Sequence, residues 1–155
     1  PSISGSESVG ITRFLMSIED PSPEIIQAVN SAVAWFQSSA IENKREKMKV
    51  VCNGEPEPVL VDDPDAPPIW ARFYELSTNR PIFLDRDSKF HYEYAEISLE
   101  RRNGYTYIDD WPATLIDIDY QVWLENFNSS ITVEAEDGTF QGHVRKAHTG
   151  YTGDG

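Results

Sequence analysis

Cysteine is almost absent from this 155-residue sequence, because Cys52 is the only one. A single cysteine cannot form an internal disulfide, and a free thiol is the simplest interpretation. Long apolar stretches are missing as well, since none approaches the roughly 18 residues that a transmembrane helix needs. The sequence begins at Pro1 rather than at methionine, shows no signal-peptide pattern, and ends in the turn-like residues TGYTGDG. We therefore expect an internal piece of a longer protein.

Positive charge is scarce, with 13 Lys and Arg residues against 26 Asp and Glu residues and a net charge of −13. Nonspecific binding to nucleic acid or to an anionic membrane depends on a basic surface, so the composition argues against both. An acidic polymer would have to meet a local cationic patch. With 39% apolar and 12% aromatic residues, the sequence is that of a globular domain.

One window, Ile69–Gly104, holds five of the eight arginines of the chain. Six cations and six acids balance there, so the window is neutral while the rest of the chain carries the excess negative charge. The cations are Arg72, Arg80, Arg86, Lys89, Arg101 and Arg102. The sequence therefore predicts that an anion site, if the chain has one, lies here. The structural alternative for each arginine is an ion pair with a neighbouring acid of the same window.

Two helices are expected ahead of this window, over residues 4–18 and 23–40. The second has Ser22 as a good N-cap, Pro23 at the first helical position and Glu24 in the first turn, where its charge complements the helix dipole. Its apolar residues repeat with a period of 3.6. This pattern makes 23–40 the firmest helix prediction in the chain.

Short strands are expected at residues 47–51 and 59–61, which are separated by an Asn-Gly pair and prolines. The acidic run that follows could offer calcium the carboxylates of Asp62, Asp63 and Asp65. It lacks the glycine and the terminal glutamate of an EF-hand loop. A solvated acidic linker is the alternative interpretation.

Within the window, alternation predicts strands over residues 72–76 and 81–84, separated by a turn. A helix is expected over residues 93–103, with Gly104 as its C-terminal cap. Trp-Pro then opens a last helix, over residues 111–127, whose aromatic residues are expected in the core. After it the sequence changes to a strand-like alternation.

Several motifs, taken in order, carry a resemblance to a known family. The segment SGSESVGITRFLMSIEDPSPEIIQAVNSAVAWF is followed by APPIWARFYELSTNRPIF, DRD and ERRNGY. Over residues 2–125 this order closely resembles the C-terminal part of family 10 polysaccharide lyases, which are pectate lyases. The tail ITVEAEDGTFQGHVRKAHTGYTGDG resembles the beginning of the β-sandwich carbohydrate-binding modules of families 6 and 35. The resemblance implies a lyase domain over residues 1–128 and a truncated module over 129–155.

The implied fold is mainly α: the C-terminal portion of an α/α toroid-like lyase domain with a few short β-strands, followed by the first strands of a truncated β-sandwich. The implied activity is that of a pectate lyase, which cleaves polygalacturonate by calcium-assisted β-elimination with an arginine as base. The C5 proton becomes acidic only when cations neutralise the adjacent carboxylate, so the transition state needs preorganised positive charge. Non-catalytic binding of an acidic cell-wall polysaccharide is the alternative from a different class of protein.

The resemblance also implies roles for individual arginines. Arg86, in the DRD turn, is the expected base, with Arg80 as the competing candidate. Arg72, Arg80 and Arg101 are expected to bind substrate carboxylates, because a guanidinium fork can bind a carboxylate through two hydrogen bonds. Arg102 follows Arg101 on a helix but points about 100° away. It is interpreted as a solvated or salt-bridged surface residue.

Calcium is the cofactor that the resemblance implies. The calcium ligands of the lyase are expected upstream of Pro1, so the isolated chain should be inactive. In the tail, Glu134 and Glu136 lie on one face of a predicted strand and could form a structural calcium site, with solvated acids as the alternative. The expected partners are polygalacturonate or pectin and the plant cell wall, with neither nucleic acid nor membrane. The protein is expected to be secreted and monomeric.

Overall fold

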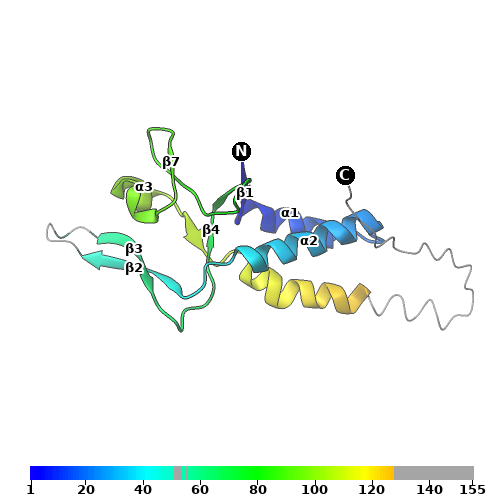
Figure 1. Cartoon of the computed structure of the whole chain (residues 1–155). Helices are drawn as coiled ribbons and strands as arrows, with labels where there is room; N and C mark the ends of the chain where they lie inside the picture. The colour runs from blue at the N-terminus through cyan, green and yellow to red at the C-terminus, as the bar shows by residue number, and fades with distance from the viewer. Residues whose placement is uncertain (51–53, 55, 128–155) are drawn as a thin grey trace, which may run out of the picture. The chain divides into compact units, whose positions relative to one another are not determined.

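The computed structural model describes residues 1–50, 54 and 56–127 of the chain (Figure 1). Contacts within the chain divide it into two units, Pro1–Trp123 and Leu124–Gly155. Almost all described residues belong to the first unit, which holds the arginine window. The fold is therefore presented for this unit.

Several sequence predictions fall outside the described residues. These are the free thiol at Cys52, the module over residues 129–155, and its suggested calcium ligands Glu134 and Glu136. The domain boundary after residue 128 likewise stays a prediction.

The helical part of the first unit consists of α1 (Glu7–Met16), α2 (Pro23–Ser39) and a helix that begins at residue 113. The last of these contains a π-helical turn, Leu115–Asp119, and is helical to residue 127. Each of the three packs on the other two. No helix in the described part of the chain is long and apolar enough to cross a membrane.

Helix α2 confirms the firmest sequence prediction. The Ser22 hydroxyl accepts a hydrogen bond from the Ile25 amide at 3.4 Å, and Pro23 occupies the first turn, where its missing amide proton costs nothing. The expected 3.6-residue period also appears in the burial. The buried apolar residues of α2 are Val29, Val33 and Phe36.

The three helices share a small apolar core. It is formed by Val9, Val33, Phe36 and Leu115, one or two residues from each helix. Polar contacts at its edge connect the same elements: Arg13 Nε donates to Asp119 at 2.7 Å, and the Tyr120 hydroxyl donates to Asn30 at 2.7 Å. The apolar cluster supplies most of the stabilisation, since exposed ion pairs contribute little.

The rest of the unit is built from short antiparallel strands. They are β1 (Ser2–Ser4), β2 (Lys44–Val50), β3 (Pro56–Asp62), β4 (Trp70–Ala71), β5 (Phe73–Glu75), β6 (Phe83–Leu84), β7 (Phe90–His91) and β8 (Ile108–Asp109). Among the described residues they pair as β1 with β5, β2 with β3, β4 with β8, and β6 with β7. The β2–β3 hairpin agrees with the two strands predicted from sequence, although both are longer than expected.

The prediction of a mainly α fold is wrong for the described residues, and they show no α/α toroid. Of these residues 41% are helical and 25% lie in strands or bridges. The strand content was underestimated because β4 to β8 are only two or three residues long. Runs this short give no readable period, and their pairing depends on partners distant in sequence: β1 pairs with β5, and β4 pairs with β8.

The helix predicted over residues 93–103 is also corrected. It is split into a 3₁₀ turn, Tyr94–Glu96, and the short helix α3, Leu99–Gly104. Between them Ser98 has an extended backbone, with φ −58° and ψ 149°. Gly104 is the last residue of α3 and not its C-cap, which is Tyr105.

Two aromatic residues connect the helices to the strands. Trp70 Nε1 donates to the Phe36 carbonyl at 2.8 Å, and the Tyr74 hydroxyl donates to the Ser39 carbonyl at 2.8 Å. The same hydroxyl accepts from the Ala71 amide at 2.9 Å. Burial raises the pKa of Tyr74 to about 12. These buried bonds fix β4 and β5 against the end of α2, and thereby position the start of the arginine window.

Two glycines provide a matched test of this packing. A methyl group on Gly5 would clash with the Ala71 carbonyl oxygen, whereas one on Gly10, inside α1, would meet nothing within 4 Å. We expect Gly5→Ala to lower the free energy of unfolding by about 1–3 kcal/mol through overpacking. Gly10→Ala should raise it by about 0.5–1 kcal/mol, because alanine restricts the unfolded chain. Urea unfolding of both variants measures the difference, and equal effects would contradict the close approach at Gly5.

Candidate anion-binding site

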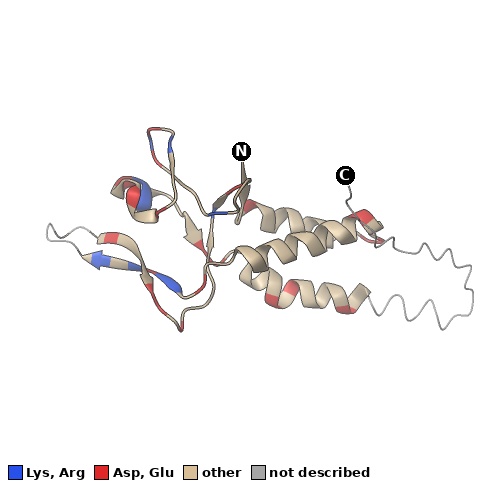
Figure 2. Cartoon of the chain, viewed as in Figure 1, with Lys and Arg blue, Asp and Glu red and all other residues tan. Residues whose placement is uncertain are grey.

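Cations of the described residues gather among the short strands. Figure 2 shows Lys and Arg on β2, on the loop between β6 and β7, and on α3, whereas α2 contains neither residue. Two cations of β2 are already paired: Lys44 Nζ lies 2.5 Å from Asp62, and Arg45 Nε lies 2.8 Å from Asp63. Lys44 and Arg45, at the start of β2, are therefore paired with acids at the end of β3 and directly after it.

This pairing bears on the suggested calcium site in the acidic run. The carboxylates of Asp62 and Asp63 face cations of β2, and Asp63 also accepts a hydrogen bond from the Asp65 amide at 3.3 Å. Within residues 1–50, 54 and 56–127, no group of three or more His, Cys, Asp or Glu side chains could hold a metal ion. The described residues thus do not fit a calcium site.

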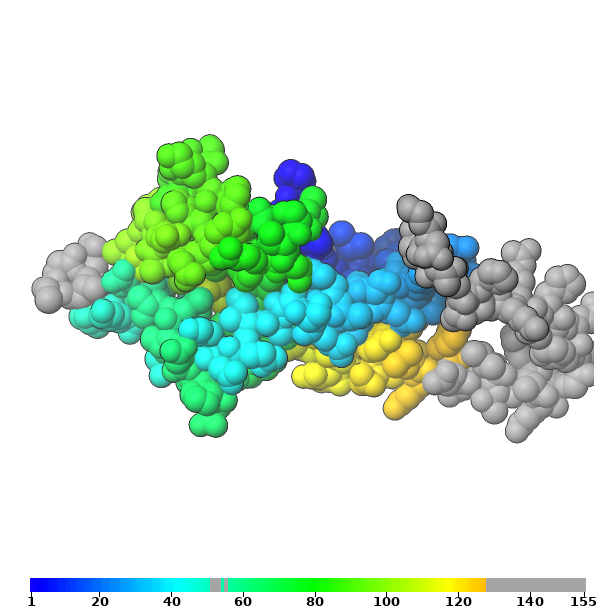
Figure 3. All heavy atoms as spheres, in the orientation of Figure 1, coloured from blue at the N-terminus to red at the C-terminus, as the bar shows by residue number. Residues whose placement is uncertain are grey.

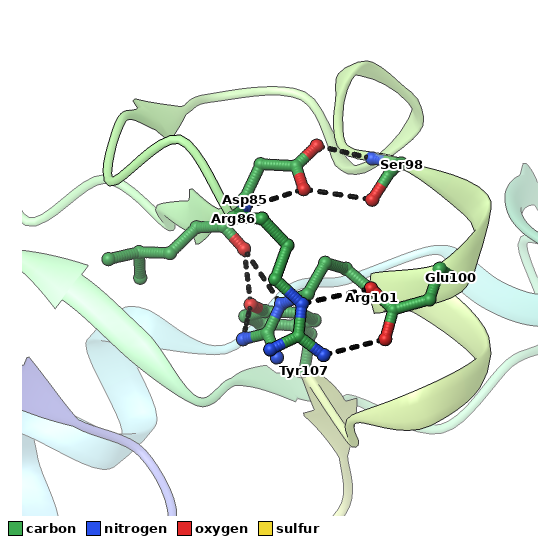
Figure 4. A network of polar contacts seen from close by, with 7 residues as sticks. Asp85, Arg86, Ser98, Glu100, Arg101 and Tyr107 are labelled. Atoms are coloured by element: carbon green, nitrogen blue, oxygen red, sulfur yellow. Dashed lines mark hydrogen bonds and ion pairs between the residues drawn. The ribbon is translucent and has the colours of Figure 1, made fainter.

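The loop between β6 and β7 is fixed to the start of α3 by Asp85. Its carboxylate accepts hydrogen bonds from the Ser98 amide at 2.6 Å and from the Ser98 hydroxyl at 2.8 Å (Figure 4). It also accepts from the Arg86 amide at 2.7 Å. These donors, the Arg86 amide first, hold the pKa of Asp85 below its ordinary value. Asp85 therefore determines where the Arg86 side chain begins.

Arg86 forms a two-bond contact with Glu100 on α3. Its Nε lies 3.0 Å from one carboxylate oxygen, and its Nη2 lies 2.6 Å from the other (Figure 4). Both side chains are exposed, at 69% and 61%. The hydrogen bond and charge of Glu100 raise the pKa of Arg86, and Arg86 in turn lowers the pKa of Glu100. The raised pKa favours the protonated form of Arg86 in this state, whereas a proton acceptor would need the opposite shift.

Arg101 lies beside this pair but binds neutral groups. Its Nη2 donates to the Tyr107 hydroxyl at 2.6 Å, and its Nε donates to the Leu84 carbonyl at 3.4 Å. The Tyr107 hydroxyl itself donates to the same Leu84 carbonyl (Figure 4). The charge of Arg101 also lowers the pKa of Glu100, after the larger effect of Arg86. Two cations, Arg86 and Arg101, are thus brought close to one carboxylate.

Tyr105 connects Arg101 to Arg72. The guanidinium of Arg101 lies 4.9 Å from the centre of the Tyr105 ring, and that of Arg72 lies 5.0 Å from it. Arg72 also lies 5.7 Å from the Trp111 ring, and its Nε donates to Glu7 at 3.0 Å. These cation–π contacts hold both guanidinium groups in place. The charge of Arg72 is already paired with Glu7, whereas Arg101 forms no ion pair among the described residues.

Arg80 lies at a different place. Its guanidinium is 3.8 Å from the centre of the Tyr92 ring, and the Tyr92 hydroxyl donates to both oxygens of Glu75 at 3.1 Å. A hydrogen bond from Thr78, and then one from Tyr92, lowers the pKa of Glu75. In the described part of the chain, these contacts connect Arg80 to Tyr92 and Glu75 rather than to the other predicted site arginines.

The interpretation of Arg102 as a solvated or salt-bridged surface residue is confirmed for the salt bridge and wrong for the position at the surface. Only 8% of it is exposed, and its Nη2 forms an ion pair with Glu57 at 2.7 Å. Its Nη1 donates to the Pro58 carbonyl at 2.7 Å, and its Nε donates to the Ile97 carbonyl at 3.2 Å. Strand β3 packs on α3, and the two segments lie side by side in Figure 3. Glu57 lies 45 residues away, so no pattern of neighbouring residues predicts that Arg102 is buried.

The structure thus brings three of the predicted arginines together and leaves the fourth apart. Arg86, Arg101 and Arg72 are connected through Glu100, Tyr107 and Tyr105, and we call these six residues the arginine cluster. The sequence interpretation gave no role to either tyrosine. The one available signal was the alternation Tyr-Thr-Tyr directly after ERRNG.

Comparison with known proteins identifies relatives of this region. A family model described as pectic acid lyase matches residues 1–116. Two solved structures are similar, each with 36% sequence identity and a TM-score of 0.65: the family 10 polysaccharide lyase from Cellvibrio cellulosa, and a mutant of that lyase in complex with trigalacturonic acid. The match covers 78% of this chain, which spans only 36–37% of those two chains. Among curated proteins, none matches.

The Asp85 contact predicts a pH dependence. Because the folded-state pKa of Asp85 is depressed, its contribution to stability is complete above its ordinary pKa and is lost as the pH falls through the folded value. Asp85→Asn should therefore be less stable than the wild type at neutral pH, and the difference should shrink as the pH falls below the ordinary pKa of an aspartate, about 4. Urea unfolding at a series of pH values measures it, with Asp117→Asn as a control for the same charge change. A difference independent of pH would contradict the assignment.

Proposed function

The chain belongs to the pectic acid lyase family, and on this premise we propose that it supplies part of the active site of an enzyme that cleaves polygalacturonate by calcium-assisted β-elimination with an arginine base. The observation that carries the proposal is the arginine cluster, in which Arg72, Arg86 and Arg101 converge through shared aromatic and acidic partners. The complex of a solved relative with trigalacturonic acid supports an acidic sugar as the ligand.

The chemistry explains why several cations are needed. Removal of the C5 proton leaves an electron pair that forms the C4–C5 double bond, while the bond from C4 to the glycosidic oxygen breaks and the leaving oxygen gains a proton. Negative charge builds on the carboxylate at C5, so fixed positive groups stabilise the transition state more than the ground state. Arg101, positioned by tyrosine rings, is suited to hold a substrate carboxylate, and Arg72 would do so after Glu7 leaves it. Arg80, on its separate turn, would contact another unit of the same polymer.

The base is assigned to Arg86, with Arg80 as the competing candidate. Arginine is normally protonated, at a pKa above about 12, and it can accept a proton only where nearby cations and burial disfavour its charge. Glu100 acts in the opposite direction by raising the pKa of Arg86. The assignment therefore requires that Glu100 leaves Arg86 before the proton is transferred.

Calcium belongs to the proposal as the cofactor that would neutralise the substrate carboxylate. The described residues do not fit its site, so no step of the proposed mechanism is assigned to a metal ligand of this chain. We further propose that the 155-residue chain alone is inactive, because it spans only 36–37% of the two solved relatives, and that the enzyme is secreted and monomeric.

A second candidate function is binding of acidic cell-wall polysaccharide without turnover. The protonated state of Arg86 favours it, since a guanidinium paired with a carboxylate is an anion binder rather than a base. Retention of the chain by polygalacturonate in affinity electrophoresis, with no product from the assay below, would favour this candidate over the lyase.

The lyase proposal is tested in a chimaera in which this chain replaces the matched region of the Cellvibrio cellulosa enzyme. We expect the chimaera to release unsaturated product from polygalacturonate in the presence of calcium, measured by ultraviolet absorbance, and the chain alone to release none. Arg86→Ala should lower kcat by about 10²- to 10⁴-fold if Arg86 is the base. Glu93→Gln, an exposed change in the same window, serves as the control.

The outcomes separate the claims. Wild-type rates in the Arg86→Ala chimaera would remove Arg86 from the role of base and leave Arg80 to be tested. A folded chimaera that forms no product at any calcium concentration would contradict the lyase proposal for this chain.

A further inference from the structure

Glu100 sits where a ligand carboxylate would be expected on Arg86. Its two oxygens accept from Nε and Nη2 of Arg86, which is the two-bond geometry by which a guanidinium recognises a free carboxylate. We propose that Glu100 is a resident carboxylate that occupies Arg86 in the absence of ligand, competes with an incoming uronate, and so sets the affinity of the arginine cluster. The inference relies on the proposed function for the class of ligand.

The contact is open to exchange. Glu100 is 61% exposed and Arg86 is 69% exposed, so a ligand can reach both partners from solvent. Glu100 lies in the first turn of α3, and its side chain can rotate away without any change in the backbone of the helix. An exposed pair of this kind contributes little net stability, because water screens it and both side chains lose freedom when they pair.

The surroundings of Glu100 favour replacement by another carboxylate. Asp85 lies close enough for its charge to raise the pKa of Glu100, which opposes the larger effects of Arg86 and Arg101. Asp85 itself is held by amide and hydroxyl donors and would stay in place. The departure of Glu100 would therefore leave two cations beside one fixed acid.

Arg101 would receive a carboxylate without rearrangement. Its own hydrogen bonds go to the Tyr107 hydroxyl and the Leu84 carbonyl, both neutral, so its charge is not paired by a direct ion pair among the described residues. Tyr105 and Tyr107 both contact its guanidinium, at 4.9 Å and 5.4 Å. Arg101 is therefore a fixed part of the anion site, while the Arg86–Glu100 pair is the part that exchanges.

A double-mutant cycle tests the competition. The dissociation constant of the 155-residue chain for trigalacturonic acid is measured by NMR titration for the wild type, Glu100→Gln, Arg86→Ala and the double variant. We expect Glu100→Gln to tighten binding by about threefold to fivefold, the range that corresponds to an exposed ion pair. On the Arg86→Ala background the same change should have little effect, because Glu100 acts through Arg86. Glu93→Gln controls for the general gain of one positive charge.

Each result supports or overturns the inference. Equal or weaker binding by Glu100→Gln would show that Glu100 positions Arg86 instead of competing for it. Glu100→Ala is the second variant if Glu100→Gln does not fold. Equal tightening on both backgrounds would reduce the effect to general electrostatics. If the wild type binds but Arg86→Ala binds equally well, the inference falls while the proposed function stands. If no variant binds trigalacturonic acid, the anion site and the inference both fall.

Discussion

The buried guanidinium of Arg102 is the constraint on which the site depends. A charge taken out of water must be paired and hydrogen-bonded, and Arg102 meets this requirement with Glu57, the Pro58 carbonyl and the Ile97 carbonyl. These partners come from β3 and from Ile97, the C-cap of the 3₁₀ turn before α3. Helix α3, Leu99–Gly104, is too short to be stable by itself. The position of α3 is therefore determined by the groups that bind the Arg102 guanidinium.

Adjacent arginines on this helix have different environments. Arg101 and Arg102 differ by about 100° around the helix axis. Arg102 therefore faces the β2–β3 hairpin, whereas Arg101 faces Leu84, the last residue of β6. Arg102 is buried and anchors the helix, while Arg101 is placed beside Arg86 and Glu100. Asp85 holds the other side of the same helix through Ser98. Anchoring of the helix and the proposed ligand binding are thus divided between neighbouring residues.

Local features could be predicted from the sequence, and contacts between distant residues could not. The start of α2 follows from Ser22 and Pro23, and its buried face follows from the apolar period. The burial of Arg102 depends on Glu57, the division of residues 93–103 depends on Asp85, and the pairing of β1 with β5 spans most of the unit. None of these has a signature within a short window. For the same reason the sequence of Ile69–Gly104 predicts that the arginines lie in one region, but it does not predict which arginines share a contact partner.

The electrostatic balance of the cluster limits how an arginine could act as a base here. In the described structure two cations face Glu100, with Asp85 nearby, so the local charge is close to neutral and the protonated form of Arg86 is favoured. Lowering the pKa of Arg86 requires that Glu100 moves away and that additional positive charge approaches. An uronate that takes the place of Glu100 on Arg86 would preserve the stabilising contact. A uronate bound to Arg86 therefore describes a binding state, and Arg86 can become the proton acceptor only after that carboxylate passes to Arg101 or Arg72.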